Sequence, residues 1–451
     1  MRTLTVSKLS PFAAVTVLAL GLGLAGCSSG GTPAASGAGS GSASAEAWPD
    51  LSGKSIQVLA EWSGTEQQQF QKVLDAFTKL THASATYQGA GDNTPTVLQS
   101  KIAGGAPPDV ALLAQPGVIA NLAKQGSIKP LDAGVVQAVD ANYDAGWKTL
   151  GTVNGQLYSV MYKAANKSTF WYNTAAFDQA GITPPKTWAD LLKDAQALSD
   201  AGITPVSVGG ADGWTLTDWF ENVYLSQAGP AMYDKLTHHQ IPWTDPSVIS
   251  ALTTLGQLFG NSKYIAGGDA GALQVSFNDS VTQTFTSPPK AAMVYEGDFS
   301  SSVITSTTSA KLGTDAKFFP FPAAGSTTNF VTGGGDAAVA LNDNPATMEF
   351  IRFLATPQAG TIWAGAGGFL SPDKNVPLSA YPDDTTRSEA SMLQQAGANF
   401  RFDMSDQAPA AFGGTKGAGE WKDLQDFLAH PTDITGTARQ LEADAAKSTW
   451  N

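Results

Sequence analysis

The chain has 451 residues, of which 42% are hydrophobic and 14% charged, so it is long enough for about two globular domains of roughly 150 residues each. Its 39 acidic and 26 basic residues give a net charge of −13, which argues against binding to nucleic acid or anionic lipid, because both need a basic surface. The single cysteine excludes internal disulfides and cysteine-rich metal sites.

The N-terminus is typical of a targeting segment. Arg2 and Lys8 precede an apolar stretch, 12–24, that is too short for a membrane span of about 20 residues. The stretch ends in the letters LAGC at 24–27, which resemble the lipobox of bacterial lipoproteins. We therefore expect a lipoprotein signal peptide at 1–26.

The only cysteine, Cys27, stands where a lipobox requires the lipidated residue. The alternative is an ordinary signal peptide with a chance cysteine. Residues 28–47 are almost entirely Ser, Gly, Ala, Thr and Pro, so 27–49 is predicted to be a lipidated flexible tether. This tether would hold the protein on the extracellular face of the cytoplasmic membrane.

The folded body opens with a strand, a polar break and a helix. An apolar run at 55–60 predicts the strand, and apolar residues at helical spacing predict a helix from about Thr65. Ser63 and Glu66 have the spacing of a capping box at its start. The break lies at the carboxyl end of the strand, which is where open α/β sheets bind ligands.

The same alternation continues along the chain. A helix near 95–103 precedes a buried strand at 109–113. Asn154 and Gly155 predict a tight β-hairpin, since this pair supplies two positive φ angles. Thr187 is expected to cap a helix whose buried face begins with Trp188. The pattern favours an α/β fold.

At this point the body resembles the extracellular solute-binding proteins of ABC importers, the family that includes the maltose-binding proteins. The resemblance runs over about 55–421 as ordered landmarks, each weak alone. They are KIAGGAPPDV at 101–110, NGQLY at 154–158, WYN at 171–173 with GI at 181–182 and PKTW at 185–188, AMVYEGD at 292–298, GGGD at 333–336, FIRFL at 350–354 and GGFLSP at 367–372.

The resemblance implies a two-lobe periplasmic-binding-protein fold, type II-like, with a hinge and a ligand cleft between the lobes. It places lobe 1 at 50–163 plus 293–341 and lobe 2 at 164–292 plus 342–451, with hinge crossings near Ala164, Ala292 and Leu341. It also implies a monomer that captures a sugar outside the membrane, delivers it to ABC permease subunits, uses no cofactor and catalyses no reaction.

A sugar site needs aromatic faces for stacking and carboxylates or amides for the hydroxyl edges. Residues of these types occur at expected strand ends and in Gly-rich loops. The predicted ligand-binding residues are Glu61, Trp62, Gln115, Asn166, Asp212, Trp214, Glu296, Asp298, Phe299 and Asp336. Phe299 stands where the family usually supplies a tryptophan, and Trp421 is a weaker candidate. Several of the carboxylates could instead be solvated or cap helices.

Two other functions remain open from the sequence. An extracellular glycoside hydrolase needs two carboxylates about 5–10 Å apart, and Glu61, Glu296 and Asp298 could meet in one cleft. A non-sugar polar solute is a further alternative. Metal uptake is not expected, because the adjacent His238 and His239 lack a matching pair of ligands.

Overall fold

The computed structural model describes residues 48–450, so the predicted signal peptide, the lipidation of Cys27 and nearly all of the tether lie outside the described residues. Within this range, no helix combines the length and the apolar character that a membrane crossing requires. The described chain contains two main β-sheets, each with its own hydrophobic core.

The first sheet is mixed and runs in the order β12-β11-β3-β1-β2, with β6 on the other side of β11. Its strands are β1 (Ser55–Ala60), β2 (Ser84–Gly89), β3 (Val110–Leu113), β6 (Ser159–Asn166), β11 (Val331–Ala340) and β12 (Phe400–Phe402). β1 pairs in parallel with β2 and β3, whereas β11 pairs antiparallel with β3 and β6. The apolar runs that predicted β1 and β3 are buried, as expected for inner strands.

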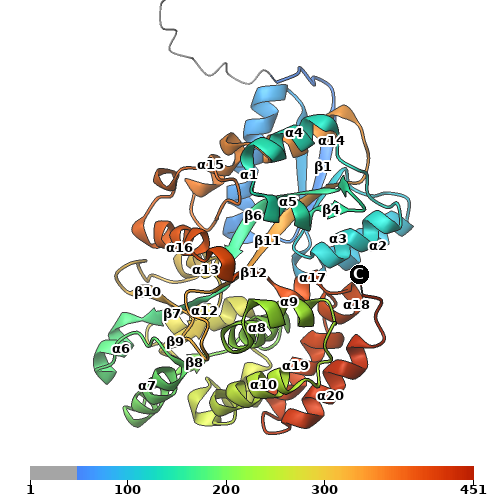
Figure 1. Ribbon diagram of the computed structural model, residues 1–451. Coiled ribbons are helices and arrows are strands. Elements are labelled where there is room, and N and C mark those ends of the chain that lie inside the picture. Colours follow the sequence, from blue (N-terminus) through green and yellow to red (C-terminus); the bar gives the residue numbers. More distant parts are fainter. Residues whose placement is uncertain (1–47, 451) are drawn as a thin grey trace, which may run out of the picture. The chain divides into compact units, whose positions relative to one another are not determined.

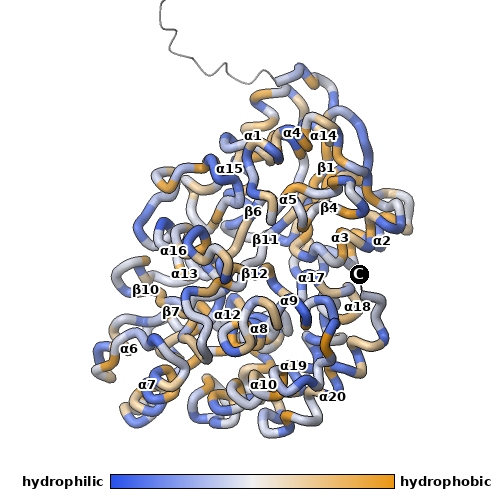
Figure 2. Tube along the Cα trace, viewed as in Figure 1, coloured by the Kyte–Doolittle hydropathy of each residue, from blue (hydrophilic) through white to orange (hydrophobic). Residues whose placement is uncertain are grey.

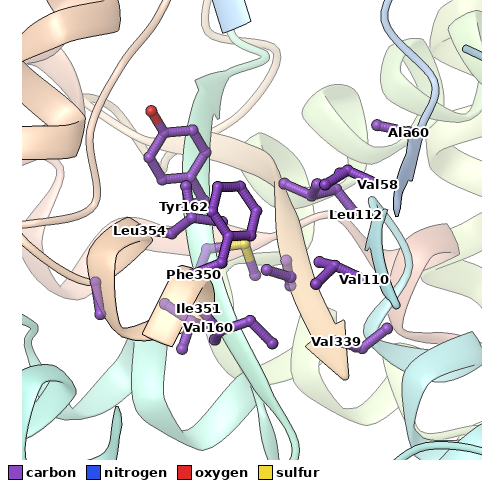
Figure 3. Close-up of a cluster of buried hydrophobic side chains, with 14 of the residues drawn as sticks. Val58, Ala60, Val110, Leu112, Val160, Tyr162, Val339, Phe350, Ile351 and Leu354 are labelled. Atoms are coloured by element: carbon purple, nitrogen blue, oxygen red, sulfur yellow. The ribbon is translucent and has the colours of Figure 1, made fainter. Parts of the chain in front are cut away.

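Helices cover this sheet and complete what we call the first lobe (Figure 1). They are α1 (Gly64–Thr81), α2 (Thr94–Ala103), α3 (Pro116–Lys124), α4 (Ala133–Asn142), α5 (Ala145–Leu150), α14 (Pro345–Leu354), α15 (Pro357–Ala364) and α16 (Asp384–Gln395), with the small hairpin β4 (Thr152–Val153) and β5 (Gln156–Leu157) and the one-turn helices η1 (Gly91–Asn93), η3 (Leu378–Ala380) and η4 (Gly397–Asn399). Figure 3 shows Phe350 and Ile351 of α14 beside Val160 of β6, with Val110 and Val339 from the neighbouring strands.

The second sheet has the order β10-β7-β9-β8 and organises the second lobe. Its strands are β7 (Thr169–Asn173), β8 (Val206–Ser207), β9 (Met293–Tyr295) and β10 (Ala316–Pro320). The helices of this lobe are α6 (Thr174–Ala180), α7 (Trp188–Asp200), α8 (Trp214–Ala228), α9 (Pro230–Thr237), α10 (Pro246–Phe259), η2 (Ser262–Tyr264), α11 (Gly268–Ala272), α12 (Phe277–Phe285), α13 (Ser300–Thr307), α17 (Met404–Gln407), α18 (Ala410–Gly413), α19 (Gly419–Ala429) and α20 (Ile434–Ala445). Figure 2 shows a mainly hydrophobic trace along β1 and a mixed trace along the outer helix α7.

The local predictions hold in most places. Asn154 and Gly155 have φ angles of 51° and 79°, which confirms the hairpin turn between β4 and β5. The Thr187 hydroxyl accepts a hydrogen bond from the backbone N–H of Asp190 at 3.2 Å, which confirms the cap of α7. The capping box predicted at the start of α1 is wrong: Ser63 makes no side-chain cap, and Glu66 pairs with Lys163 of β6.

The lobe boundaries expected from the sequence differ from the structure in two segments. The prediction places 293–320 in lobe 1, but β9 and β10 of this segment pair with β7 of the second sheet. It places 345–402 in lobe 2, but α14 and α15 pack in the core of the first lobe, and β12 pairs with β11 of the first sheet. The chain passes between the sheets at 167–168, at 321–330 and at 403. A short apolar strand fits either sheet, so the sequence pattern does not show which one it joins.

Candidate ligand-binding site

A cavity of about 360 Å³ lies between residues of the first and the second lobe. First-lobe loops at the ends of β1 and β3 supply one wall, together with β6 and β11. Second-lobe segments around the starts of α8 and α12 supply the opposite wall. The volume falls at the small end of the range for small-molecule pockets, roughly 300–1,000 Å³.

Seven of the ten predicted ligand-binding residues line this cavity: Glu61, Trp62, Gln115, Asp212, Trp214, Phe299 and Asp336. They come from five separate parts of the chain. The structure brings them together because the carboxyl ends of β1 and β3 open toward the second lobe, as expected for an α/β sheet.

The other three predicted residues do not line the cavity. The Asp298 carboxylate accepts a hydrogen bond from the backbone N–H of Asn166 at 2.6 Å, and the Asn166 side chain accepts one from the backbone N–H of Ser168 at 3.1 Å. Glu296 is buried beside the same strand crossing. The side chains of Asn166 and Asp298 support the passage from β6 to β7. The rule that ligands bind at strand ends does not distinguish this structural use of polar residues from ligand binding.

Asp336 and Lys163 form the polar floor of the cavity on the first-lobe side. Lys163 Nζ lies 2.5 Å from Glu66 Oε1. Burial opposes its charge, but Glu66 and Asp336 hold the pKa of Lys163 above its usual value. Burial raises the pKa of Asp336 to about 6, although Lys163 acts to lower it. Burial and the charge of Asp336 also raise the pKa of Glu61 well above its usual value.

Lys167 lines the cavity at the crossing between the sheets. Its Nζ is 2.5 Å from Asp403, 3.1 Å from Asp218 and 3.6 Å from Asp406. Burial acts to raise the pKa of Asp403, but Lys167 holds it well below its usual value. Burial raises the pKa of Asp218 and of Asp406. The cluster therefore joins the crossing at 167 to the crossing at 403.

Aromatic rings form the second-lobe wall. The rings of Trp214, Phe277 and Phe299 lie with centroids 5.2–5.9 Å apart. Trp62 lines the cavity from the first lobe and Trp421 from the second. Three buried polar atoms of lining residues make no hydrogen bond of normal geometry in the described chain: Asp336 Oδ1, Trp62 Nε1 and Trp421 Nε1. The Trp62 indole nevertheless lies close enough to Asp336 to act to lower the pKa of that carboxyl.

An ion pair links the two lobes at the rim of the cavity. Lys416 Nζ, on the second lobe, is 3.4 Å from Asp92 Oδ2 of η1 and 3.2 Å from Asp212 Oδ1. The other oxygen of Asp212 accepts the backbone N–H of Phe277 at 2.7 Å, which fixes the start of α12. Asp212 thus has a structural role beside its predicted contact with ligand.

Sequence reasoning missed several lining residues, above all Lys163, Lys167 and Phe277. A signal for Lys163 was present: it is the only charged residue in a strand, β6, whose eight residues are all buried. A charged side chain in such a strand requires a partner. Phe277 gave no comparable signal, since it is one of 21 phenylalanines.

The hydrolase alternative depended on three carboxylates meeting in one cleft. Only Glu61 of that group lines the cavity, whereas Glu296 and Asp298 lie at the strand crossing. Among residues 48–450, no group of three or more His, Cys, Asp and Glu side chains is arranged to hold a metal ion.

Comparison with known proteins places this architecture among solute receptors. The osmoprotective compounds-binding protein GgtB of Synechocystis sp. is 33% identical over 398 residues, which cover 86% of this chain and 92% of GgtB. The alpha-glucosides-binding periplasmic protein AglE of Rhizobium meliloti is 34% identical over 394 residues, covering 84% of each chain.

Solved structures show the same fold at low sequence identity. The bacterial solute receptor AcbH, described as exclusive for β-D-galactopyranose, has a TM-score of 0.76 at 21% identity, covering 89% of this chain and 99% of AcbH. Maltose-bound MalE3 of T. maritima has a TM-score of 0.70 at 16% identity, covering 87% and 99%. The expected two-lobe periplasmic-binding-protein fold is confirmed. A family profile matches residues 61–361, and on this match and these relatives the chain belongs to the bacterial extracellular solute-binding proteins.

Proposed function

We propose that this chain is the receptor of an ABC importer, and that it captures a sugar or short oligosaccharide in the interlobe cavity and delivers it to the permease. The observation that carries the proposal is the set of unpartnered polar atoms beside aromatic rings. Asp336 Oδ1 can accept a hydrogen bond from a hydroxyl, and the indole N–H groups of Trp62 and Trp421 can donate one.

Such a site fits a sugar for two physical reasons. The rings of Trp214, Phe277 and Phe299 offer faces for the C–H surface of a pyranose. Buried polar atoms left without a partner cost about 1–3 kcal/mol each, so a ligand that pairs with all of them gains both affinity and selectivity. The name of AglE, an alpha-glucosides-binding protein, supports the same class of ligand, whereas that of GgtB gives only osmoprotective compounds.

The location follows from the same proposal. We infer that the mature protein is held outside the cytoplasmic membrane by a lipid on Cys27, with 27–49 as the tether. The family match supports the extracellular location. The anchor itself stays a prediction from the sequence, and a Cys27→Ser variant that still fractionates with membranes would contradict it.

The test is calorimetric titration and thermal shift of residues 48–451 with glucose, galactose, maltose, trehalose, sucrose, polyols and amino acids. A binding sugar at a hundred times its Kd stabilises the protein by about 2.7 kcal/mol. We expect binding of at least one sugar without product formation, and its loss in Trp214→Ala.

Trp48→Ala is the matched control, because Trp48 is also half-buried but packs on Phe353 far from the cavity lining. Binding of amino acids alone would keep a receptor and reject the sugar. Release of a hydrolysed sugar would make the protein an enzyme.

A further inference from the structure

The cavity is rich in charge, yet its cations are already paired. Six acidic residues line it, Glu61, Glu66, Asp92, Asp212, Asp336 and Asp406, against two lysines, Lys163 and Lys167. A third lysine, Lys416, lies at the rim. The lining residues of the described chain include no arginine. Whether this site accepts an anionic ligand therefore depends on whether either lysine is free to pair with it.

Lys163 is held by Glu66. The two charged atoms are 2.5 Å apart, and the side chains are 5% and 26% exposed, respectively. The ammonium also lies 5.5–5.9 Å from the ring centroids of Trp62, Phe299 and Trp363, close enough for cation–π attraction. These rings surround the lysine, so it has little room to swing away from Glu66 toward a ligand.

Lys167 is held even more completely. Three carboxyl groups, those of Asp218, Asp403 and Asp406, lie within 3.6 Å of its Nζ. Its ammonium is also 5.6 Å from the ring of Trp214. A ligand carboxylate that approached Lys167 would have to displace one of these three carboxyl groups, and the other two would repel it.

The unpaired polar atoms of the lining supply no positive charge for an anionic ligand. Asp336 Oδ1 accepts hydrogen bonds, and it would repel an anion when ionised. The indole N–H groups of Trp62 and Trp421 can donate to the oxygen of a hydroxyl, an ether or an anion, but they carry no charge. Neither type of atom compensates the desolvation of a carboxylate or phosphate, which needs a paired cation when buried.

We propose that the site selects uncharged sugars against sugar acids and sugar phosphates, and that Glu66 enforces this choice by occupying Lys163. The proposal rests on the function proposed above, since it concerns which sugars enter the same cavity. Glu66 is a specificity-determining residue in this account, because its carboxylate takes the position that an anionic ligand group would otherwise fill beside Lys163.

The first test compares each neutral sugar with its acid in the native sequence, residues 48–451. Glucose is paired with glucuronate and with glucose 6-phosphate, galactose with galacturonate, and maltose with maltobionate, each titrated by calorimetry. We expect every acid to bind at least about tenfold more weakly than its neutral partner, as an uncompensated buried charge requires. An acid that binds as tightly as its neutral partner overturns the proposal while leaving a sugar receptor.

The second test removes the charge that blocks Lys163. Glu66→Gln keeps the shape of the side chain and makes the floor of the cavity more positive by one charge. We expect the ratio of acid to neutral affinity to rise by about tenfold or more. Glu349→Gln is the control, because Glu349 pairs with Arg352 in α14, away from the cavity, and its side chain has a similar exposure of 27%.

The outcomes separate the two proposals. If no sugar and no sugar acid binds, the proposed function fails. If neutral sugars bind and Glu66→Gln leaves the acid-to-neutral ratio unchanged, the role of Glu66 is overturned and the sugar receptor stands. If Glu66→Gln does not fold, the comparison of paired ligands with the native sequence still decides whether the site excludes acids.

Discussion

Asp336 is buried in the floor of the cavity, and one of its oxygens has no hydrogen-bond partner. Burial raises its pKa to about 6, so the folded protein disfavours the charged form that a sugar hydroxyl would use. The charged carboxylate of Asp336 is therefore costly in the ligand-free protein, and a hydrogen bond from a ligand would offset part of that cost. Side chains that bind ligands often lower the stability of the free protein in this way.

Because Asp336 favours binding but not stability, Asp336→Asn should change the affinity for sugar and the melting temperature in different ways. The variant should bind the preferred sugar about ten- to a hundredfold more weakly, because a hydrogen bond to a charged group is worth about 1.5–3 kcal/mol. The melting temperature without sugar should stay the same or rise, because the variant removes a buried carboxyl whose charged form is disfavoured by burial. Calorimetric titration and a melt measure the two effects, and a fall in melting temperature with unchanged affinity would assign Asp336 a structural role.

At the scale of elements, the bridge from η1 to the second lobe stands out. Lys416 contacts Asp92 of the first lobe and Asp212 of the second at the cavity rim. The lysine side chain is 43% exposed, so the pairs are partly screened by solvent. Because such receptors close around a ligand by a hinge motion, a bridge between the lobes favours the closed form.

Lys416→Ala should weaken sugar binding by less than about fivefold, since exposed ion pairs contribute about 0.2–1 kcal/mol. The loss should appear mainly as faster dissociation. It should also remove part of the dependence of affinity on salt, which screens exposed charges. Lys422→Ala is the control, because Lys422 is 47% exposed and pairs with Asp426 within α19. Equal effects of both variants would exclude a specific bridge.

At the scale of the whole described chain, Lys167 joins parts that are far apart in sequence. It follows β6, its partner Asp403 follows β12, and its partner Asp218 belongs to α8. The ion cluster thus fastens two of the passages between the sheets to the second lobe. Its burial makes it sensitive to the loss of any one charge.

Lys167→Met should lower the free energy of unfolding by about 3–5 kcal/mol, because it leaves buried carboxyl groups without their cation. Urea unfolding measures this loss. Lys422→Met, which breaks an exposed pair in α19, should change it little. If Lys167→Met changed the free energy of unfolding only slightly, the buried carboxyl groups would not depend on the lysine, and this prediction would be wrong.

Stability should also depend on pH in a particular direction. Burial raises the pKa of Asp336 to about 6 and the pKa of Asp298 to about 7, above the value of about 3.9 for an unfolded chain. Between pH 4 and 7 the folded state then binds more protons than the unfolded state, so the free energy of unfolding falls as pH rises. We expect the ligand-free protein to melt at a higher temperature at pH 5 than at pH 7.5.

Asp298→Asn tests whether carboxyl groups with a raised pKa cause this dependence of stability on pH. The variant keeps an oxygen that can accept the backbone N–H of Asn166 but no longer titrates. It should flatten the dependence of melting temperature on pH. A melting temperature that rises from pH 5 to pH 7.5 in the native sequence would show that groups with lowered pKa, such as Asp403, dominate instead.

Sequence patterns were enough to predict the α/β class, the type of most local elements and seven residues that line the cavity. These follow from short-range physics: apolar periodicity for β1 and α7, positive φ angles for the turn at Asn154, and the rule that ligands bind at strand ends. Landmarks along the chain also identified the family correctly.

Tertiary structure alone decided which sheet β9 joins, which core α14 enters and which polar residues serve the cavity. Asn166 and Asp298 satisfy each other across the strand crossing, whereas Glu66 leaves its expected cap to pair with Lys163. These choices depend on contacts between residues 97–132 positions apart. A buried polar group takes the partner that the fold brings near it, and no local pattern records which partner that is.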